Sequence, residues 1–239
     1  MIKDLKCIKK NEVHLFGGKA ANLGFLMQNG FNVPEGFCIS TKIDRIDNKI
    51  KREIVKKFKK FKSKVAVRSS ATLEDSKKSS FAGQFDTFLN VDDKEQLIAA
   101  ITKCKISIES KRAKYYISGK KLSNVEMAVI VQTMINADYA GVIFTVDPIK
   151  KKHILIEIVK GLGDKLVSGE VTPSSYFIDK TNMKIKNEFN SFNINKNIIQ
   201  KLVKTALKIE SIYKTPQDIE FCVKNGKIFI LQSRPITAL

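Results

Sequence analysis

Residues 217–235 read QDIEFCVKNGKIFILQSRP, two runs of alternating apolar and polar residues joined at Asn225-Gly226. The pattern predicts a β-hairpin, and a two-residue turn at Asn225-Gly226 is its simplest loop. That turn would place the apolar residues of the two strands on opposite faces, which a half-buried sheet does not tolerate. We therefore predict a three-residue loop, Asn225-Gly226-Lys227, with a bulge at Gly226 or Lys227.

This loop determines which residues of the hairpin lie opposite each other. The apolar pairs that it turns toward the core are Phe221 with Leu231 and Val223 with Phe229. On the other face, Glu220 falls opposite Gln232, and Asp218 falls opposite Arg234. A carboxylate beside an amide supplies oxygen ligands that suit Mg²⁺ carrying phosphates. A solvated face with an exposed Asp–Arg pair of little energetic value is the alternative that the hairpin alone leaves open.

The rest of the chain extends this picture to two lobes. A length of 239 residues is enough for one large domain or two small lobes. The composition, 43% hydrophobic and 28% charged, is that of an ordinary globular protein. Helical patterns, such as the amphipathic one at 197–213, precede and follow β-rich runs in both halves. We predict an α+β protein with an N-terminal lobe at 1–135 and a C-terminal lobe at 136–239.

Several features bear on location. No stretch approaches the roughly 18 consecutive apolar residues of a membrane span. The start, MIKDLKCIKK, has no apolar segment of the kind found in secretory signals. The four cysteines are far apart in the sequence, as free thiols in a reducing compartment are. We expect a cytoplasmic protein with no membrane partner.

A net charge of +19 suggests anionic ligands. Nucleic-acid binding is one interpretation, but the cations are mostly lysines spread over the whole chain, and lysine is less suited to bidentate recognition. The two densest runs, 49–64 and 103–121, fall in helical patterns and are most simply solvated faces. We do not expect nucleic acid as a partner.

Two N-terminal stretches carry candidate phosphate-binding residues. Residues 13–26, VHLFGGKAANLGFL, place Lys19 after two glycines and before a helical pattern, yet they match neither common glycine-rich phosphate motif. The run VAVRSSATLED ends a buried strand at Arg68, where a guanidinium can bind a phosphate through two hydrogen bonds. An ion pair of Arg68 with Glu74 or Asp75 remains the alternative.

Five motifs in this order resemble the N-terminal nucleotide-binding domain of the phosphoenolpyruvate synthase, pyruvate phosphate dikinase and rifampin phosphotransferase family. They are FGGKAANLGFL…GFNVPEGFCIS, VAVRSSATLED…SFAGQFDTFLNV, VIVQTMINADYAGVIFTVDPI, GLGDKLVSGEVTPSSYFID and PQDIEF…IFILQSRPIT. Together they span nearly the whole chain. The resemblance implies an ATP-grasp fold, in which two α+β lobes hold ATP between them.

The resemblance also implies a role for individual residues. Those implied at ATP are Lys19 and Arg68 on the phosphates, Gly83 and Thr87 in the loop over them, Gln132 with the backbone of Thr133, Met134 and Ile135 at the adenine edge, and Asp218. Glu220 and Gln232 are implied as the Mg²⁺ ligands. Arg234 would stabilise charge on the transferred phosphoryl group, and Lys19, Arg68 and Arg234 are the implied catalytic residues.

The domain of this family cleaves ATP to AMP and phosphate and passes the β-phosphoryl group to a histidine on a separate domain. We therefore expect an ATP- and Mg²⁺-dependent phosphotransferase of the dikinase type. Its histidine would lie on a partner protein or on the remainder of a longer chain, since neither His14 nor His153 lies in a phosphohistidine motif. Asp164 stands where the family commonly has Glu. The alternatives are direct phosphorylation of a small molecule and a non-catalytic ATP-binding regulatory module.

Overall fold

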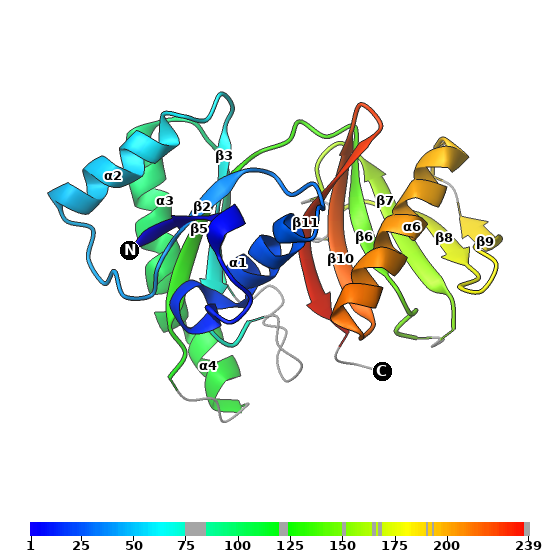
Figure 1. Ribbon diagram of the computed structural model, residues 1–239, viewed down its shortest axis with the longest axis horizontal. Helices are drawn as coiled ribbons and strands as arrows, with labels where there is room; N and C mark the ends of the chain where they lie inside the picture. The colour runs from blue at the N-terminus through cyan, green and yellow to red at the C-terminus, as the bar shows by residue number, and fades with distance from the viewer. Residues whose placement is uncertain are drawn as a thin grey trace. The chain divides into compact units, whose positions relative to one another are not determined.

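The computed structural model describes residues 1–74, 85–119, 124–149, 152–163, 166, 169–189, 191–192 and 194–236. The chain divides into two compact units, one formed by Met1–Gly30 with Pro34–Met134 and the other by Phe31–Val33 with Ile135–Leu239. Each unit is built on one antiparallel sheet with helices packed against it (Figure 1). The predicted α+β class is confirmed.

The first unit has a five-stranded sheet. Its strands, in spatial order, are β1 (Ile2–Asp4), β2 (Gly36–Ile39), β5 (Met127–Thr133), β3 (Val65–Ala71) and β4 (Thr87–Val91). Its helices are η1 (Leu5–Cys7), α1 (Val13–Gln28), α2 (Asn48–Phe58), α3 (Lys94–Ile106), η2 (Ser107–Glu109) and α4 (Lys111–Gly119). Asp47 and Asp93 cap α2 and α3 by accepting from backbone N–H groups in the first turn, which explains where these helices begin.

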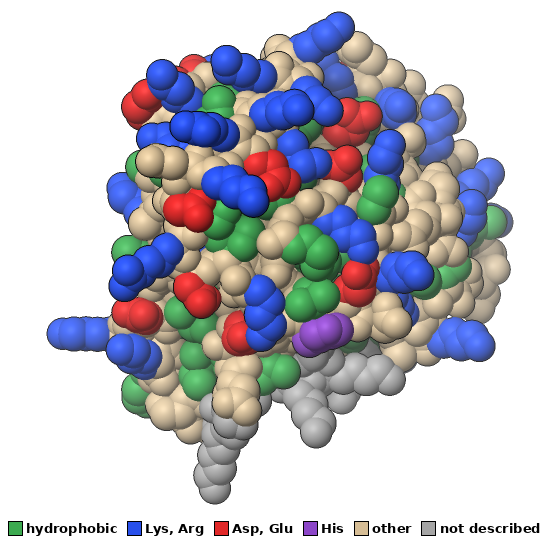
Figure 2. All heavy atoms as spheres, turned by 60° about the vertical axis from the view of Figure 1, so that its left-hand side comes forward, with side chains coloured by type: hydrophobic (Ala, Val, Ile, Leu, Met, Phe, Trp, Pro, Cys, Tyr) green, Lys and Arg blue, Asp and Glu red, His purple; other side chains and the backbone are tan. Residues whose placement is uncertain are grey.

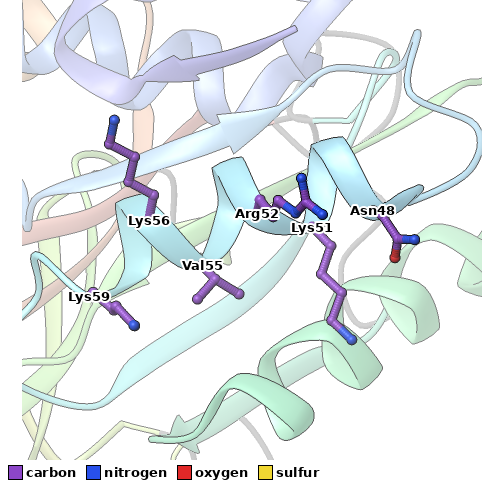
Figure 3. Close-up of a pocket in the computed structure, with 6 residues that line it drawn as sticks. All are labelled: Asn48, Lys51, Arg52, Val55, Lys56 and Lys59. Carbon is purple, nitrogen blue, oxygen red and sulfur yellow. The ribbon is translucent and has the colours of Figure 1, made fainter.

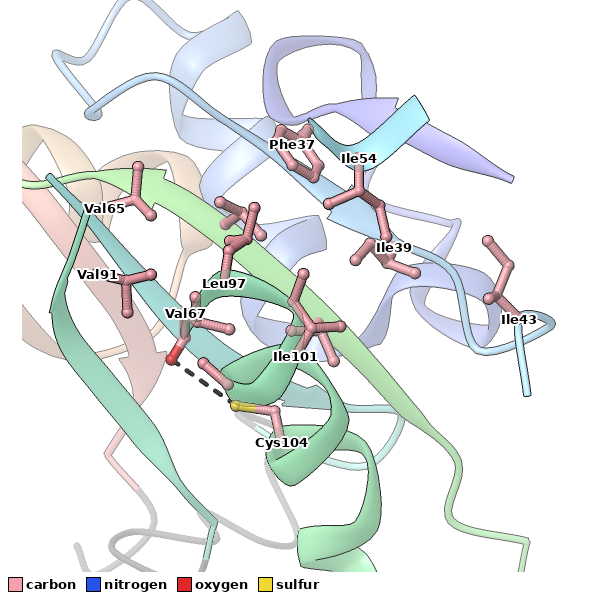
Figure 4. Packing of buried hydrophobic residues seen from close by; sticks show 13 residues of the cluster. Phe37, Ile39, Ile43, Ile54, Val65, Val67, Val91, Leu97, Ile101 and Cys104 are labelled. Atoms are coloured by element: carbon pink, nitrogen blue, oxygen red, sulfur yellow. Dashed lines mark hydrogen bonds between the residues drawn. The ribbon is translucent and has the colours of Figure 1, made fainter. Parts of the chain in front are cut away.

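Alternation along the strands separates the two faces of this sheet. Val65 and Val67 of β3 point into an apolar core with Ile54 of α2 and Leu97 and Ile101 of α3 (Figure 4). The intervening strand positions face the other way, toward α1. The sheet therefore lies between α2 and α3 on one face and α1 on the other, and Arg68 lies on the α1 face.

Helix α1 is broken at Gly17. The helical pattern that the sequence places after Lys19 begins earlier, because the apolar residues before Gly17 already form the first turn of α1. Gly17 has φ +77°, and a Cβ atom on it would lie 2.1 Å from the carbonyl oxygen of Ser70. Ser70 Oγ donates to Phe16 O at 2.8 Å and accepts from Ala20 N at 3.1 Å, which fastens the break to β3. Glycine is needed here for its backbone angle and for close approach.

The second unit has a six-stranded sheet covered on one face by α6 (Lys196–Tyr213). Its strands, in spatial order, are β11 (Lys227–Pro235), β10 (Gln217–Lys224), β6 (Tyr139–Phe144), β7 (Ile154–Lys160), β8 (Ser174–Ile178) and β9 (Ile185–Phe189). The apolar stripe of α6 is buried at Ile199, Leu202, Val203, Ala206 and Ile209. Within the described residues, no helix of either unit combines the length and the apolar character needed to cross a membrane.

The hairpin β10–β11 corrects part of the predicted register. Near the turn, Phe221 pairs with Ile230 and Val223 with Ile228, so the predicted pairs Phe221–Leu231 and Val223–Phe229 are wrong. The turn is the two-residue Asn225-Gly226 type, because both residues have positive φ, 51° and 71°.

The extra residue lies in the middle of the hairpin instead of in its loop. The register shifts between Glu220 and Phe221, with Leu231 as the unpaired residue of the opposite strand. The core residues Phe221 and Val223 are therefore paired with Ile230 and Ile228, whereas Phe229 and Leu231 pack with Cys222 on the other face of the hairpin. Beyond the bulge, the predicted pairs Asp218–Arg234 and Glu220–Gln232 are confirmed.

Candidate functional site

Asp218 and Arg234 form a buried ion pair on the second unit's hairpin. Arg234 donates from Nε and from one terminal nitrogen to Asp218 Oδ2, at 2.8 and 2.7 Å. Burial raises the pKa of Asp218, and the positive charge of Arg234 opposes that rise. The side chains are 11% and 20% exposed, so the pair is not the solvated one that the sequence left open. Asp218 thus holds the guanidinium of Arg234 in a defined direction.

Glu220 and Gln232 lie directly opposite each other, one pair further along the same face. Glu220 is half-buried and Gln232 is 5% exposed. Mg²⁺ is usually held by one or two carboxylates together with phosphate oxygens and water. A carboxylate beside an amide oxygen fits that ligand set. No three His, Cys, Asp or Glu side chains of the described chain gather as a metal site of their own.

A third carboxylate of this face, beside those of Asp218 and Glu220, was not predicted. Glu157 of β7 pairs with Val142 of β6, which in turn pairs with Glu220, so Glu157 lies two strands away on the same face. Burial raises the pKa of Glu157, and the carboxylate of Asp147 raises it further. The only sequence signal was one acid inside the apolar run HILIEIV.

Lys19 lies on the first unit, where α1 leaves its break. Its Nζ donates to Ser69 O at 3.1 Å and to Glu74 Oε1 at 3.0 Å, and its side chain is 7% exposed. Glu74 also accepts from Ala71 N at 3.0 Å through its other oxygen. Lys19 is therefore a fixed buried charge with two of its three N–H donors engaged.

The pairing of Glu74 with Lys19 was not predicted from the sequence. Glu74 was weighed as a partner of Arg68, whereas the described residues pair it with Lys19. Asp75, the other suggested partner of Arg68, lies outside the described residues. The two ends of the Lys19–Glu74 pair are 55 positions apart, so no local pattern links them.

Arg68, Thr87 and Gln132 come together on the α1 face of the first unit's sheet. Thr87 of β4 pairs directly with Arg68 of β3, and its side chain is exposed. Arg68 donates to Gln132 Oε1 at 3.4 Å, while Gln132 Nε2 donates to Pro34 O at 3.1 Å. The amide of Gln132 thus connects Arg68 to the turn before β2.

The predicted adenine-edge segment runs across the division of the chain. Thr133 ends β5, Met134 is the last residue of the first unit, and Ile135 opens the second. The backbone N–H groups of Thr133 and Met134 already donate to Glu35 O at 2.8 Å and Lys64 O at 2.9 Å. Gly83, predicted in the phosphate loop, lies outside the described residues, as does Asp164.

Ile135 belongs to a small apolar cluster of the second unit. Ala137, Ala140 and Cys222 are its buried members, and Ile135, Leu162, Phe229 and Leu231 pack against them. Ala140 and Cys222 pair across β6 and β10, on the face that carries Glu220. The carboxylate–amide pair and an apolar surface therefore share one face of one sheet.

Comparison with known proteins identifies the family. The family model described as pyruvate phosphate dikinase, AMP/ATP-binding domain, matches residues 42–191 and 186–239. A probable phosphoenolpyruvate synthase of Archaeoglobus fulgidus is 33% identical over 97% of this chain and 41% of its own length. A rifampicin phosphotransferase of Bacillus cereus is 30% identical over all of this chain and 36% of its own length. The chain thus spans less than half of these relatives.

Solved structures agree on the fold. PH1788 of Pyrococcus horikoshii aligns with a TM-score of 0.53 at 17% identity, covering 97% of each chain. A D-alanine–D-alanine ligase of Helicobacter pylori aligns with a TM-score of 0.50 at 12% identity, covering 95% of this chain and 55% of that one. The predicted fold and family are confirmed: the chain is an ATP-binding domain of the ATP-grasp fold and belongs to the pyruvate phosphate dikinase AMP/ATP-binding domain family.

Proposed function

We propose that this chain is the ATP-cleaving part of a dikinase-type phosphotransferase. In this reaction ATP, one water and a histidine give AMP, inorganic phosphate and phosphohistidine. The bond from the β-phosphorus to the oxygen that leaves with AMP is replaced by a bond to the histidine nitrogen. Water replaces the bridging oxygen at the γ-phosphorus, which leaves as inorganic phosphate, so that the β-phosphoryl group stays on the histidine. The histidine belongs to a partner protein or to a further part of a longer chain.

The observation that carries the proposal is the hairpin of the second unit. Glu220 faces Gln232, and Arg234 is oriented by Asp218 one pair away. Phosphoryl transfer requires little covalent chemistry from the protein, which instead positions the phosphates and neutralises their charge. Mg²⁺, held by Glu220 and Gln232, would supply neutralising charge at the phosphate oxygens.

The first unit supplies further positive charge. Arg68 pairs across its sheet with Thr87, whose side chain is exposed, and a guanidinium beside a hydroxyl suits phosphate oxygens. Lys19 contributes a buried charge, with one N–H donor that is not engaged by the described residues. We assign the adenine ring to the apolar cluster of Ile135 and Leu231, whose side chains suit a flat aromatic ligand.

Thermal unfolding with millimolar ATP tests nucleotide binding. Mg²⁺ and ATP together should raise the melting temperature, because a ligand at about 100 times its Kd stabilises the folded state by about 2.7 kcal/mol. Glu220→Ala should abolish this protection, whereas Glu188→Ala, an exposed acid on β9, should retain it. Absence of any ATP-dependent protection of the wild-type chain would refute the proposal.

A product assay tests the chemistry separately. The chain is incubated with Mg²⁺, labelled ATP and the isolated phosphohistidine domain of a phosphoenolpyruvate synthase, and AMP is resolved from ADP. AMP with an acid-labile phosphoprotein is expected. ADP as the nucleotide product would indicate ordinary kinase chemistry, and protection without turnover would indicate a regulatory ATP-binding module.

A further inference from the structure

Helix α2 carries a groove that the ATP chemistry does not use. Six residues line it: Asn48, Lys51, Arg52, Val55, Lys56 and Lys59 (Figure 3). The groove is a shallow, open space of about 730 Å³ among these side chains, all of which come from α2 and the residue that ends it. A hollow lined by one helix is open on its other side. It therefore fits an elongated surface better than an enclosed small molecule.

The opposite side of α2 packs against the core of the first unit. Ile54 is fully buried in the first unit's core, and Ile50 and Phe58 pack against the same core. Lys57, on this inner side, is ion-paired with Asp4 at 2.6 Å. The groove residues are thus not required for the attachment of α2 to its sheet.

The four cations of the groove form a stripe of like charge. Lys51, Arg52, Lys56 and Lys59 are exposed, and none of them is ion-paired with a carboxylate of the described chain. Arg52 and Lys56 are four residues apart, and Lys56 and Lys59 are three apart, spacings at which like charges destabilise a helix. Basic side chains also spread widely over the face of the molecule shown in Figure 2, with acids among them. An anionic partner would relieve this repulsion.

We propose that the α2 groove docks an acidic segment of a partner protein, with carboxylates around an apolar side chain. Val55, half-buried, lies between the cations in the middle of the stripe. An apolar residue inside a charged rim matches the centre of a protein–protein contact. A nucleic-acid backbone offers phosphates but no apolar group at that point, and the groove contains no aromatic ring on which a base could stack. The proposal does not depend on ATP turnover.

Binding of a designed peptide tests the proposal. The probe is an 18-residue fluorescent peptide with Glu at helical positions i, i+3, i+4 and i+7 around Leu, and a scrambled peptide of equal composition is its control. Fluorescence anisotropy should show binding that weakens as salt rises, and the scrambled peptide should bind at least several-fold more weakly. Equal binding of the two peptides would overturn the proposal.

Matched charge reversals test the location. Arg52→Glu/Lys56→Glu should weaken peptide binding at least about tenfold. Lys201→Glu/Lys204→Glu, on exposed positions of α6 with the same charge change, should weaken it much less. Unchanged melting temperatures would show that both double variants are folded. Equal losses of peptide affinity in the two double variants would mean that net charge alone explains the binding, and would overturn the proposed docking site.

Val55→Ser distinguishes a protein partner from a nucleic acid or a membrane surface. It should weaken peptide binding while leaving the binding of single-stranded DNA and of anionic phosphatidylserine vesicles unchanged. The proposal fails if Val55→Ser has no effect on the peptide. It also fails if DNA or vesicles bind more tightly than the peptide and depend on Arg52 and Lys56.

Discussion

The buried pair of Lys19 and Glu74 gives a sharp test of how the first unit is held together. Their side chains are 7% and 5% exposed, and their charged atoms lie 3.0 Å apart. Glu74→Gln keeps the size of the side chain but leaves the ammonium of Lys19 buried without its counter-charge. Removing one partner of a buried ion pair destabilises a protein by about 3–5 kcal/mol. We expect a loss in this range in urea unfolding.

An exposed pair of the same unit is the matched control. Lys42 and Glu126 lie 3.1 Å apart with side chains 62% and 44% exposed. Exposed pairs contribute about 0–1 kcal/mol, so Glu126→Gln should change the free energy of unfolding by less than about 1 kcal/mol. Because the two pairs have nearly the same N–O distance, a difference between their losses of stability reports the effect of burial.

The double variant Lys19→Met/Glu74→Gln completes a thermodynamic cycle. It removes the stranded charge as well as the pair, so its loss of stability should be smaller than the sum of the two single losses by about 0.5–3 kcal/mol. Two results would refute the reasoning: a loss for Glu74→Gln no larger than that for the exposed control, or additive single losses.

Three further predictions follow from geometry and titration. Gly17→Ala should destabilise the first unit by about 1–3 kcal/mol more than Gly30→Ala, because both glycines have positive φ but only Gly17 is in contact with a backbone carbonyl; equal losses in urea would contradict this. Asp218→Asn should slow AMP formation more than it weakens ATP binding, because Arg234 loses its charged partner; unchanged turnover would speak against an orienting role. Burial raises the pKa of the Cys222 thiol to about 12 in the folded protein, so on raising the pH the unfolded thiol loses its proton first. The free energy of unfolding should therefore fall between about pH 8.5 and 12, by about 1.4 kcal/mol per pH unit. Urea midpoints at pH 8 and 10 should therefore differ less in Cys222→Ala than in the wild type, and equal differences would contradict the assignment.

The elements that were predictable have strong local signals. Alternating apolar residues identified the strand that contains Glu220, an apolar run that ends in polar residues identified the strand that contains Arg68, and the 3.6-residue period identified α6. The short edge strands β1 and β9 were missed. Four of the five residues of β9 are exposed, so neither face of the strand needs to be apolar, and its sequence shows almost no alternation of apolar and polar residues.

The candidate site was predictable only in part. The pairs Asp218–Arg234 and Glu220–Gln232 follow from the hairpin register beyond the bulge, and the family resemblance pointed to the same residues. The bulge itself was misplaced. A turn sequence determines the pairing of its immediate neighbours, whereas the extra residue can be accommodated anywhere that the core tolerates it.

The sequence by itself determined the class of fold, the family and the two polar pairs of the C-terminal hairpin, Asp218–Arg234 and Glu220–Gln232, because these depend on residue periods and on short ordered motifs. The tertiary structure alone decided that Glu74 pairs with Lys19 and that Ser70 fastens the break at Gly17. These contacts join residues 50 or more positions apart. Such pairings are decided by the packing of α1 on its sheet, which brings buried charges and backbone groups within hydrogen-bonding distance and makes each require a partner.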